Sequence, residues 1–231
     1  RLDFAVGSTG LMRQALSLAL HYGRHRRAFQ RSLVDLPLMS NVLADLALDV
    51  EGSLALAMRV ARALDEAGGD ETAAKLARIG PPIAKYWSCK RAPAFIAETL
   101  ECMGGNGYIE DAPMARLYRE APLNGIWEGS SNMVALDVLR ADERDPGCLE
   151  AVFDEVNEAR SGNAALGAAC DALKDAFADK GKREFRSRLL VEKLAHLWQA
   201  ALLIQNAPTA IADAFITTRI VAGHGPLFGR L

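Results

Sequence analysis

One carboxylate stands out among the residues whose surroundings could support chemistry. Glu128 lies in the run Ile126-Trp127-Glu128-Gly129-Ser130-Ser131, between a bulky apolar pair and residues that can begin a helix. A carboxylate in an apolar setting can act as a general base, whereas amides at a helix N-terminus favour its charged form. A surface glutamate or a capping acid explains the same pattern, and these residues alone favour that simpler interpretation.

A glycine-rich run is the second candidate, with Gly104, Gly105 and Gly107 around Asn106. Backbone without side chains lets a ligand approach closely, and its amides can hold phosphate or adenine groups. The run lacks the Lys-Ser/Thr of a Walker loop and the third glycine of a dinucleotide fingerprint, and no strand is expected before it. On its own, it indicates the C-terminal cap of a helix.

Two groups of basic residues could bind anions. The first, at the end of a predicted helix, favours an anion-binding surface and consists of Arg24, His25, Arg26, Arg27 and Arg31. His21 and His25 are four residues apart, but no third ligand accompanies them and the arginines would repel a cation, so we expect no metal site. The second group is diluted by acids and favours a solvated helix face over a DNA footprint: Lys180, Lys182, Arg183, Arg186, Arg188 and Lys193.

The whole chain is patterned as helices that could position these candidates. Ala and Leu crowd every long segment, and apolar residues recur at helical spacing over about residues 3–29, 36–64, 72–103 and 132–144. In the second segment, Asp45, Asp49, Arg59 and Arg62 lie off the apolar stripe. The third is expected to break or kink at Gly80-Pro81-Pro82, and the periodicity fades over residues 108–129.

Further helices are expected after Asp145-Pro146 and over residues 164–178, 182–205 and 208–222. We therefore predict an all-α fold. An up-down-up-down four-helix bundle over residues 1–145 is followed by an additional helical subdomain over residues 146–231.

Composition limits the classes of partner. The 27 basic and 29 acidic residues nearly balance, so the overall charge gives no reason to expect a polyanion. The four cysteines form no CxxC pair and lie in apolar patterns, which indicates buried thiols and a reducing, cytoplasmic compartment. The chain starts at Arg1 with no signal peptide, and we expect it to begin partway through a longer protein. The uncharged stretch over residues 194–212 contains polar residues, which favour a core helix over a membrane span.

Three motifs follow one another along residues 1–144. They are Arg26-Arg27-Ala28-Phe29, then Glu101-Cys102-Met103-Gly104-Gly105-Asn106-Gly107-Tyr108, then Tyr118-Arg119-Glu120 with Ile126-Trp127-Glu128-Gly129-Ser130-Ser131-Asn132. In this order they resemble RxxFG, QxxGGxGY and YRDA–IxEGTSE in the C-terminal half of FAD-dependent acyl-CoA dehydrogenases. The sequence is most similar to the AidB-like branch, which is linked to the response to DNA alkylation, and residues 146–231 resemble the extra helices of that branch.

The resemblance implies oxidation of acyl-CoA thioesters with Glu128 as the base and FAD as the cofactor. Arg26 would contact FAD phosphate across a subunit boundary in a homo-oligomer. Glu101, Gly104, Gly105 and Gly107 would face the adenosine-diphosphate portion, and Ser130 would donate its hydroxyl near FAD. The electron acceptor is not implied.

Several positions depart from the family pattern. Gln30 replaces the Gly of RxxFG, Pro37 lies near an expected flavin-contacting Gln, and Glu101 replaces a Gln. Some members keep the base at a position that would precede Arg1.

The domains that precede this bundle in the family are absent from the sequence, so we expect the chain alone to be inactive. Two other hypotheses stay open. Residues 146–231 could be a nucleic-acid-binding module, or the bundle could be an oligomerisation scaffold with vestigial flavin motifs.

Overall fold

The computed structural model describes residues 1–160, 163–223, 225 and 228–229. Within them, the only strands form the two-stranded hairpin β1 (Arg27–Ala28) and β2 (Arg31–Ser32). The helices are α1 (Leu2–His25), η1 (Leu33–Asp35), α2 (Pro37–Glu66), α3 (Glu71–Cys102), α4 (Gly105–Tyr108), α5 (Met114–Asn124), α6 (Ser131–Arg144), α7 (Cys148–Ala159), α8 (Ala164–Ala178), α9 (Ser187–Asn206), α10 (Thr209–Phe215) and the π-helix η2 (Ile216–Val221). The predicted all-α fold is confirmed.

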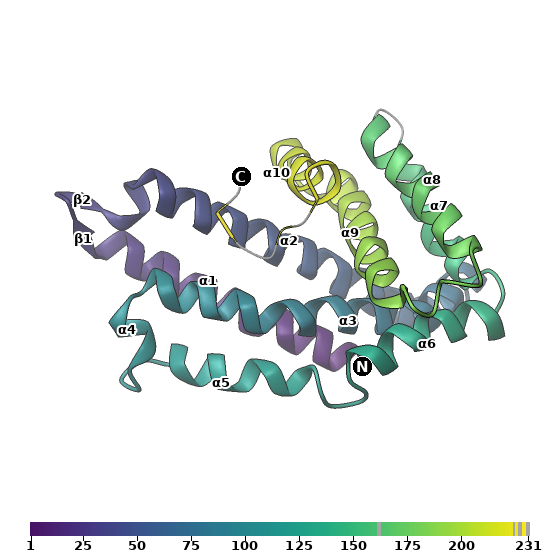
Figure 1. Ribbon diagram of the computed structural model, residues 1–231, viewed down its shortest axis with the longest axis horizontal. Helices are drawn as coiled ribbons and strands as arrows, with labels where there is room; N and C mark the ends of the chain where they lie inside the picture. The colour runs from purple at the N-terminus through teal and green to yellow at the C-terminus, as the bar shows by residue number, and fades with distance from the viewer. Residues whose placement is uncertain (161–162, 224, 226–227, 230–231) are drawn as a thin grey trace.

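The bundle has α3 at its centre. Figure 1 shows α1 running from the N-terminus to the hairpin, α2 returning, α3 running alongside α1 again, and α5 returning to α6. Helix α3 packs against α1, α2, α5 and α6. Because short connections join successive helices, neighbours in sequence are antiparallel neighbours in space.

The first predicted helix is too long at its C-terminal end. Helix α1 ends at His25, and Arg27–Ala28 pairs with Arg31–Ser32 around a two-residue loop. Phe29 and Gln30 in that loop have φ values of 49° and 65°. Two consecutive residues with positive φ are typical of a tight hairpin whose twist matches its strands, and helical periodicity cannot reveal this turn.

The sequence predicts a break or kink in the third helix, and the structure shows that the helix is not broken. Helix α3 continues through Pro81, Pro82 and Pro93. Ile79, Pro82 and Ile83 are buried in the core, and packing on both sides holds the helix where local propensity would end it. Other differences are local. Residues 108–129, where the periodicity fades, contain the helix α5. Helix α7 begins after Gly147 instead of after Asp145, and α9 begins at Ser187 instead of residue 182.

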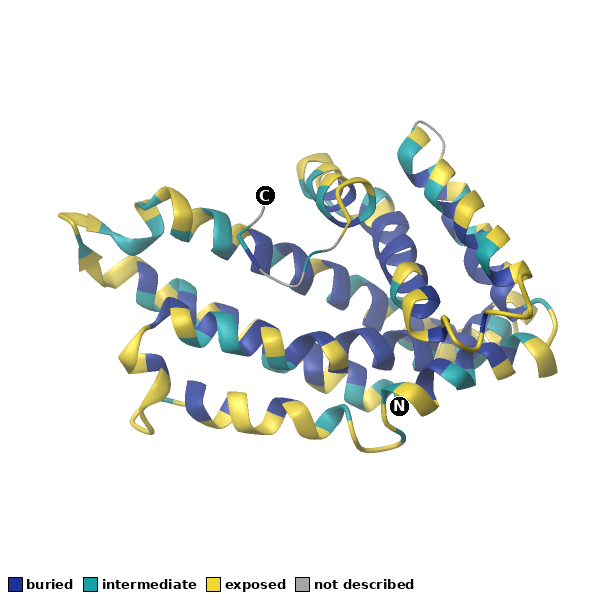
Figure 2. Cartoon of the chain, in the orientation of Figure 1, coloured by how far each residue is buried: buried dark blue, intermediate teal, exposed yellow. Residues whose placement is uncertain are grey.

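The core is continuous between the bundle and the C-terminal helices. Helix α9 packs against α2, α3 and α6, and one apolar cluster contains Ile83 of α3, Val138 of α6 and Trp198 of α9. Figure 2 shows α9 buried along most of its length, with exposed residues near its two ends. A second cluster fills the space among α1, α2, α3 and α5. The proposed boundary near residue 145 therefore divides segments that share a core.

A buried ion cluster also joins the two segments. Asp45 and Asp49 lie off the apolar stripe of α2 but are only 3% and 2% exposed. Arg91 Nε lies 2.5 Å from Asp49 Oδ2, Arg219 of η2 lies 2.9 Å from Asp49 Oδ1, and Arg219 also pairs with Asp45. Burial alone would lower the pKa of Arg219, but the Asp49 and Asp45 carboxylates outweigh it and raise that pKa.

The four cysteines are free and buried, as predicted. Burial raises the pKa of each thiol, to about 12 at Cys102. A raised pKa leaves little thiolate, so these thiols are poor nucleophiles. In the part of the chain that the structure describes, no helix is long and apolar enough to cross a membrane.

Candidate functional site

The predicted site residues fall at two ends of the bundle. Arg26, Glu101 and the glycine run lie at the end that carries the hairpin and α4, where Asn106 Nδ2 donates to Tyr22 Oη at 3.0 Å. Glu128 lies at the other end, because Arg1 Nε donates to its carbonyl oxygen at 3.3 Å. Helix α1 has 24 residues between these ends and is therefore about 36 Å long.

The Glu128 loop, residues 125–130, connects α5 to α6 in an unusual backbone conformation. Glu128 has a φ of 55° and Gly129 a φ of 106°. Glycine tolerates positive φ, but a left-handed conformation costs an L-residue such as Glu128 about 1–2 kcal/mol. The loop therefore needs contacts that hold it.

Two cationic side chains supply those contacts. Arg1 donates to the Glu128 carbonyl and also pairs with Asp137 on α6. Lys85 of α3 donates from Nζ to the Gly129 carbonyl at 2.7 Å. A hydrogen bond to a charged group contributes about 1.5–3 kcal/mol, which is enough to offset the strain at Glu128.

The Glu128 side chain itself is exposed. Its neighbours Ile126 and Trp127 are 64% and 51% exposed, although Trp127 packs on Phe4 with ring centroids 5.8 Å apart. The expected apolar enclosure of Glu128 is therefore not formed by the described residues of this chain. Instead, a fixed backbone presents an open carboxylate beside apolar side chains.

Ser130 occupies the N-cap position of α6, which begins at Ser131, one residue before the predicted start at residue 132. Its side chain is exposed and makes no capping hydrogen bond with the described residues. The Ser130 carbonyl accepts from Val134 N at 3.0 Å, which continues the helix. The Ser130 hydroxyl therefore lies beside Glu128 on the same exposed edge.

The glycines of residues 104–107 serve different purposes. Gly104 has a φ of 57°, and a Cβ at Gly107 would lie 2.5 Å from the Leu100 carbonyl oxygen, so the fold requires both. Gly105 has neither constraint, because a Cβ there would meet nothing within 4 Å. The predicted helix cap thus explains Gly104 and Gly107, whereas Gly105 leaves its backbone open to a ligand.

Glu101 lines a groove of about 630 Å³ between α3, α4 and α5. Its other walls include Leu100, Tyr108 and Tyr118, and Arg119 pairs with Glu110 at its edge. Aromatic and aliphatic walls with a few polar groups are typical of small-molecule sites. Glu101 contributes a hydrogen-bond acceptor to it.

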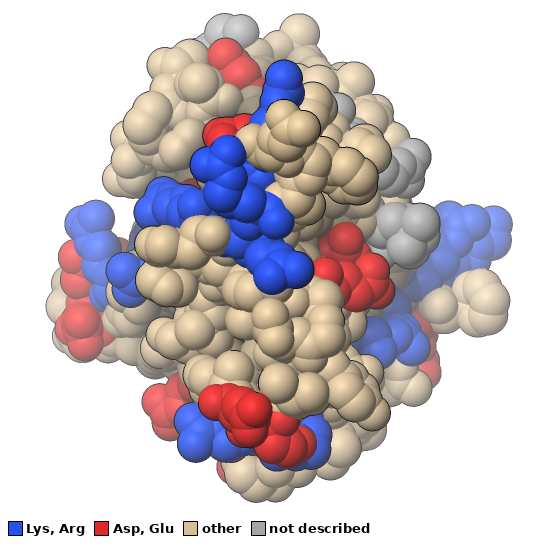
Figure 3. Space-filling view, turned by 90° about the vertical axis from the view of Figure 1, so that its left-hand side faces the viewer, with Lys and Arg blue, Asp and Glu red and all other residues tan. Residues whose placement is uncertain are grey.

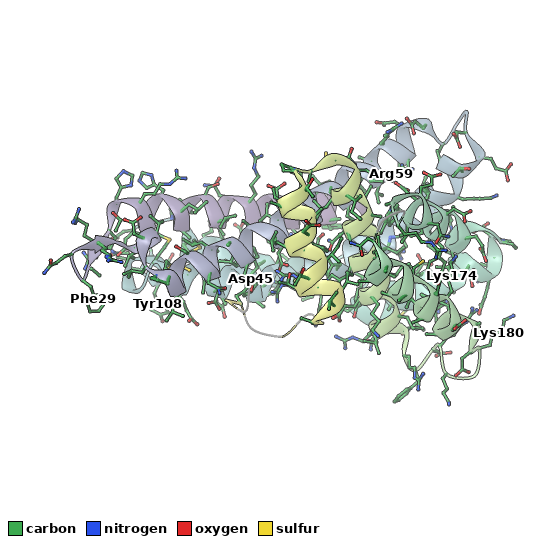
Figure 4. All side chains as sticks on the ribbon, turned by 90° about the horizontal axis from the view of Figure 1, so that it is seen from above. Phe29, Asp45, Arg59, Tyr108, Lys174 and Lys180 are labelled. Atoms are coloured by element: carbon green, nitrogen blue, oxygen red, sulfur yellow. The ribbon has the colours of Figure 1, made fainter. Side chains whose placement is uncertain are left out.

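Arg26 belongs to a basic patch at the hairpin end. Arg24, Arg26, Arg27 and Arg31 are all exposed there, and Figure 3 shows this concentration of positive charge when the molecule is viewed from that end. Such a patch attracts anions. Figure 4 places the exposed Phe29 and Tyr108 at the same end.

The comparisons with known proteins agree with this arrangement. A profile of the family described as "Acyl-CoA dehydrogenase, C-terminal domain" matches residues 1–141. The chain belongs to the acyl-CoA dehydrogenase family. This confirms the resemblance that the three motifs indicated.

Individual relatives extend the comparison. The putative acyl-CoA dehydrogenase AidB of Escherichia coli is 45% identical over 159 residues, 69% of this chain and 28% of AidB. The crystal structure of Caenorhabditis elegans ACDH-11 in complex with C11-CoA superposes with a TM-score of 0.85 at 27% identity, covering 94% of this chain and 41% of that one. A Bacillus anthracis acyl-CoA dehydrogenase complexed with FAD shares the fold, with a TM-score of 0.65 at 19% identity over 96% of this chain and 43% of that one. The chain thus spans well under half the length of these acyl-CoA dehydrogenases.

Sequence reasoning missed Lys85, Arg1's partner Asp137 and the ring of Phe4. One signal for Lys85 was present, because it is the only charged residue between Arg78 and Lys90. A lone charge in an apolar helical run indicates a buried group with a specific partner.

The remaining candidates were a metal site and the second basic group. Among the described residues, no group of three or more His, Cys, Asp or Glu side chains could hold a metal ion. In the second basic group, Arg183 is 6% exposed and pairs with Asp142 and Glu143. These contacts favour a structural role for Arg183 over a phosphate contact.

Proposed function

We propose that this chain is the C-terminal helical part of an FAD-dependent acyl-CoA dehydrogenase, which oxidises acyl-CoA thioesters between the α and β carbons. FAD, when bound, supplies the acceptor for the β hydride. The ACDH-11 complex with C11-CoA and the family membership of the chain support this substrate class. We propose the activity for the full-length protein, since the chain covers only part of its relatives.

The Glu128 loop is the observation that carries the proposal. A general base must hold its carboxylate in a fixed place while leaving it accessible to the substrate. Glu128 meets both conditions, because two cations hold its backbone and its side chain is exposed. The alternative base position would precede Arg1, whose side chain donates to the Glu128 carbonyl.

The hairpin end fits the phosphate and adenosine portion of FAD. Arg26 lies in the basic patch and would pair with phosphate, while Gly104, Gly105 and Gly107 form a turn that a ligand can approach at Gly105. Glu101 would accept a hydrogen bond from a ribose hydroxyl or an amide. The Ser130 hydroxyl would donate at the Glu128 end.

Because Arg26 and Glu128 lie at opposite ends of α1, one FAD molecule cannot reach both within one chain. We therefore propose a homo-oligomer in which a second copy supplies Arg26. Exposed apolar side chains near the hairpin support this, since Phe29 is 88%, Leu38 83% and Tyr108 76% exposed, and such surface is typical of interfaces. Light scattering should therefore show an oligomer, and a monodisperse monomer would contradict this proposal.

Anaerobic flavin reduction tests the function. The full-length protein should be yellow as purified, and an acyl-CoA panel should identify a thioester that bleaches its flavin. Glu128→Gln should retain flavin and slow bleaching by about 100-fold to 10,000-fold, as expected when a general base is removed. Glu158→Gln, an exposed glutamate on α7, is the matched control and should bleach like the wild type.

Each contrary result has its own meaning. A full-length protein that never contains flavin would support the oligomerisation scaffold instead. If Glu128→Gln holds flavin and bleaches at the wild-type rate, the position preceding Arg1 becomes the base.

A further inference from the structure

Lys85 is a charged side chain in an unusually buried place. It lies on α3 and is only 1% exposed. No carboxylate of the described residues lies within ion-pair distance of Lys85 Nζ. The Nζ lies over the Phe4 ring, 5.8 Å from the ring centroid. Burial lowers the pKa of Lys85 because it disfavours the charged form.

The hydrogen bond to the Glu128 loop accounts for this burial. Lys85 Nζ donates to the carbonyl of Gly129, the residue directly after Glu128. Arg1 donates to the carbonyl of Glu128 itself. Two consecutive backbone carbonyls, those of Glu128 and Gly129, therefore each accept a hydrogen bond from a basic side chain. Glu128 and Gly129 both have positive φ, so we expect the backbone of this segment to relax if either donor is removed.

The two donors also fix the loop from different sides. Lys85 extends from the middle of α3, while Arg1 precedes α1 and is itself tied to Asp137 on α6. Side-chain direction follows backbone dihedrals, so the orientation of the Gly129 peptide bears directly on where the Glu128 carboxylate points. A shift of about 1 Å in a reacting group can cost about 100-fold in rate.

We propose that Lys85 is a positioning residue for Glu128, holding the Glu128–Gly129 backbone so that the Glu128 carboxylate faces the α carbon of the acyl thioester. This inference rests on the proposed role of Glu128 as the base. Lys85 does not contact the substrate; it acts through the Gly129 carbonyl.

The test is a double-mutant cycle in the full-length flavoprotein. Lys85→Met keeps the length and apolar stem but removes the donor, and Lys90→Met is the matched control, because Lys90 is exposed on the same helix. We expect Lys85→Met to slow flavin bleaching at saturating acyl-CoA by about 10-fold to 100-fold. Flavin content and the acyl-CoA concentration for half-maximal rate should stay near wild type.

The cycle separates positioning from a general structural role. In the Glu128→Gln background, Lys85→Met should slow bleaching by less than about 3-fold, because the group that it positions is already gone. If the two effects multiply instead, Lys85 does not act through Glu128 and the proposal is wrong. The proposal is also wrong if Lys85→Met bleaches at the wild-type rate.

A second substitution keeps the test decisive if Lys85→Met fails to fold or loses flavin. Lys85→Arg retains a cationic donor and should keep a rate closer to wild type than Lys85→Gln, which has a shorter neutral donor. Equal rates for these two variants would overturn the proposal. A wild-type rate for Glu128→Gln would instead refute the proposed base, so the two failures are distinguishable.

Discussion

Replacing Arg219 with methionine tests the buried ion cluster that joins η2 to the bundle. Among the described residues, two carboxylates and two guanidinium groups meet in this cluster: Asp45, Asp49, Arg91 and Arg219. Their side chains are 4%, 1%, 7% and 4% exposed, respectively. Arg219→Met keeps most of the packing volume but removes the guanidinium that pairs with both buried carboxylates. Breaking a buried ion pair by removing one partner costs about 3–5 kcal/mol.

This loss should appear clearly in a thermal melt. Unfolding entropy of about 2.1 cal/mol/K per residue gives about 0.5 kcal/mol/K for the 231 residues of the chain. A loss of about 4 kcal/mol should therefore lower the Tm by about 8 °C. Differential scanning calorimetry of wild type and Arg219→Met measures this shift directly.

A double variant isolates the charge from the packing. Asp45→Asn removes one of the two carboxylates with which Arg219 pairs, and it keeps an acceptor for Gly229 N, which lies 2.8 Å from Asp45 Oδ2. Arg219→Met with Asp45→Asn should therefore recover more than half of the lost Tm. Arg62→Met, at an exposed arginine of α2, is the control and should melt like the wild type. The reasoning fails if Arg219→Met melts like the wild type, or if the double variant melts below the single one.

Three further predictions follow from local geometry and charge. Burial, and after it the nearby Glu101, raises the pKa of Glu98 above its ordinary value of 4.5, so folding stability falls as the pH rises above 4.5 and Glu98 ionises. Glu98→Gln should therefore raise the Tm at pH 7 but not at pH 4, and an equal shift at both pH values would contradict this. Gly107→Ala should lower the Tm, because the alanine Cβ would lie 2.5 Å from the Leu100 carbonyl oxygen, whereas Gly105→Ala should leave the Tm unchanged, because a Cβ there would meet nothing within 4 Å. Equal Tm values for the two variants would show that the fold does not need Gly107 more than Gly105. Gln30→Gly should stabilise the chain by up to about 1 kcal/mol in urea unfolding, because Gln30 has a φ of 65°, and a loss of stability would show that its side chain matters more than its backbone.

The sequence predicts those elements whose determinants are local. Helix α8 begins and ends at Ala164 and Ala178, as expected, because Asn163 accepts from Leu166 N as a cap and the apolar spacing is regular. Helix α3 shows the limit, since its internal prolines predict a break that burial overrides. Tertiary packing of this kind has no signature in a window of a few residues.

In the candidate site, too, the sequence predicts local features but not the contacts between distant segments. Motif spacing predicts Glu128 as a site residue, but it does not reveal the two cationic donors that hold the loop. Lys85 lies 44 residues from Gly129, and Arg1 lies 127 residues from Glu128. Asp45 and Asp49 lie off the apolar stripe of α2, and their burial is explained only once Arg219 is placed beside them. Contacts between distant segments are therefore the part that local patterns cannot supply.

The motif residues differ in whether the fold needs them. Gly107 is required by the approach of Leu100, and Gly104 by its φ of 57°. Gly105 and the exposed side chains of Arg26 and Glu128 have no such requirement among the described residues. A chain gains no stability from an open glycine or a strained, exposed glutamate, so these positions are best explained by contacts with groups outside this chain. Gly105→Ala tests the proposed FAD contact, because under that proposal it should leave the Tm of the chain unchanged while weakening flavin retention in the full-length protein.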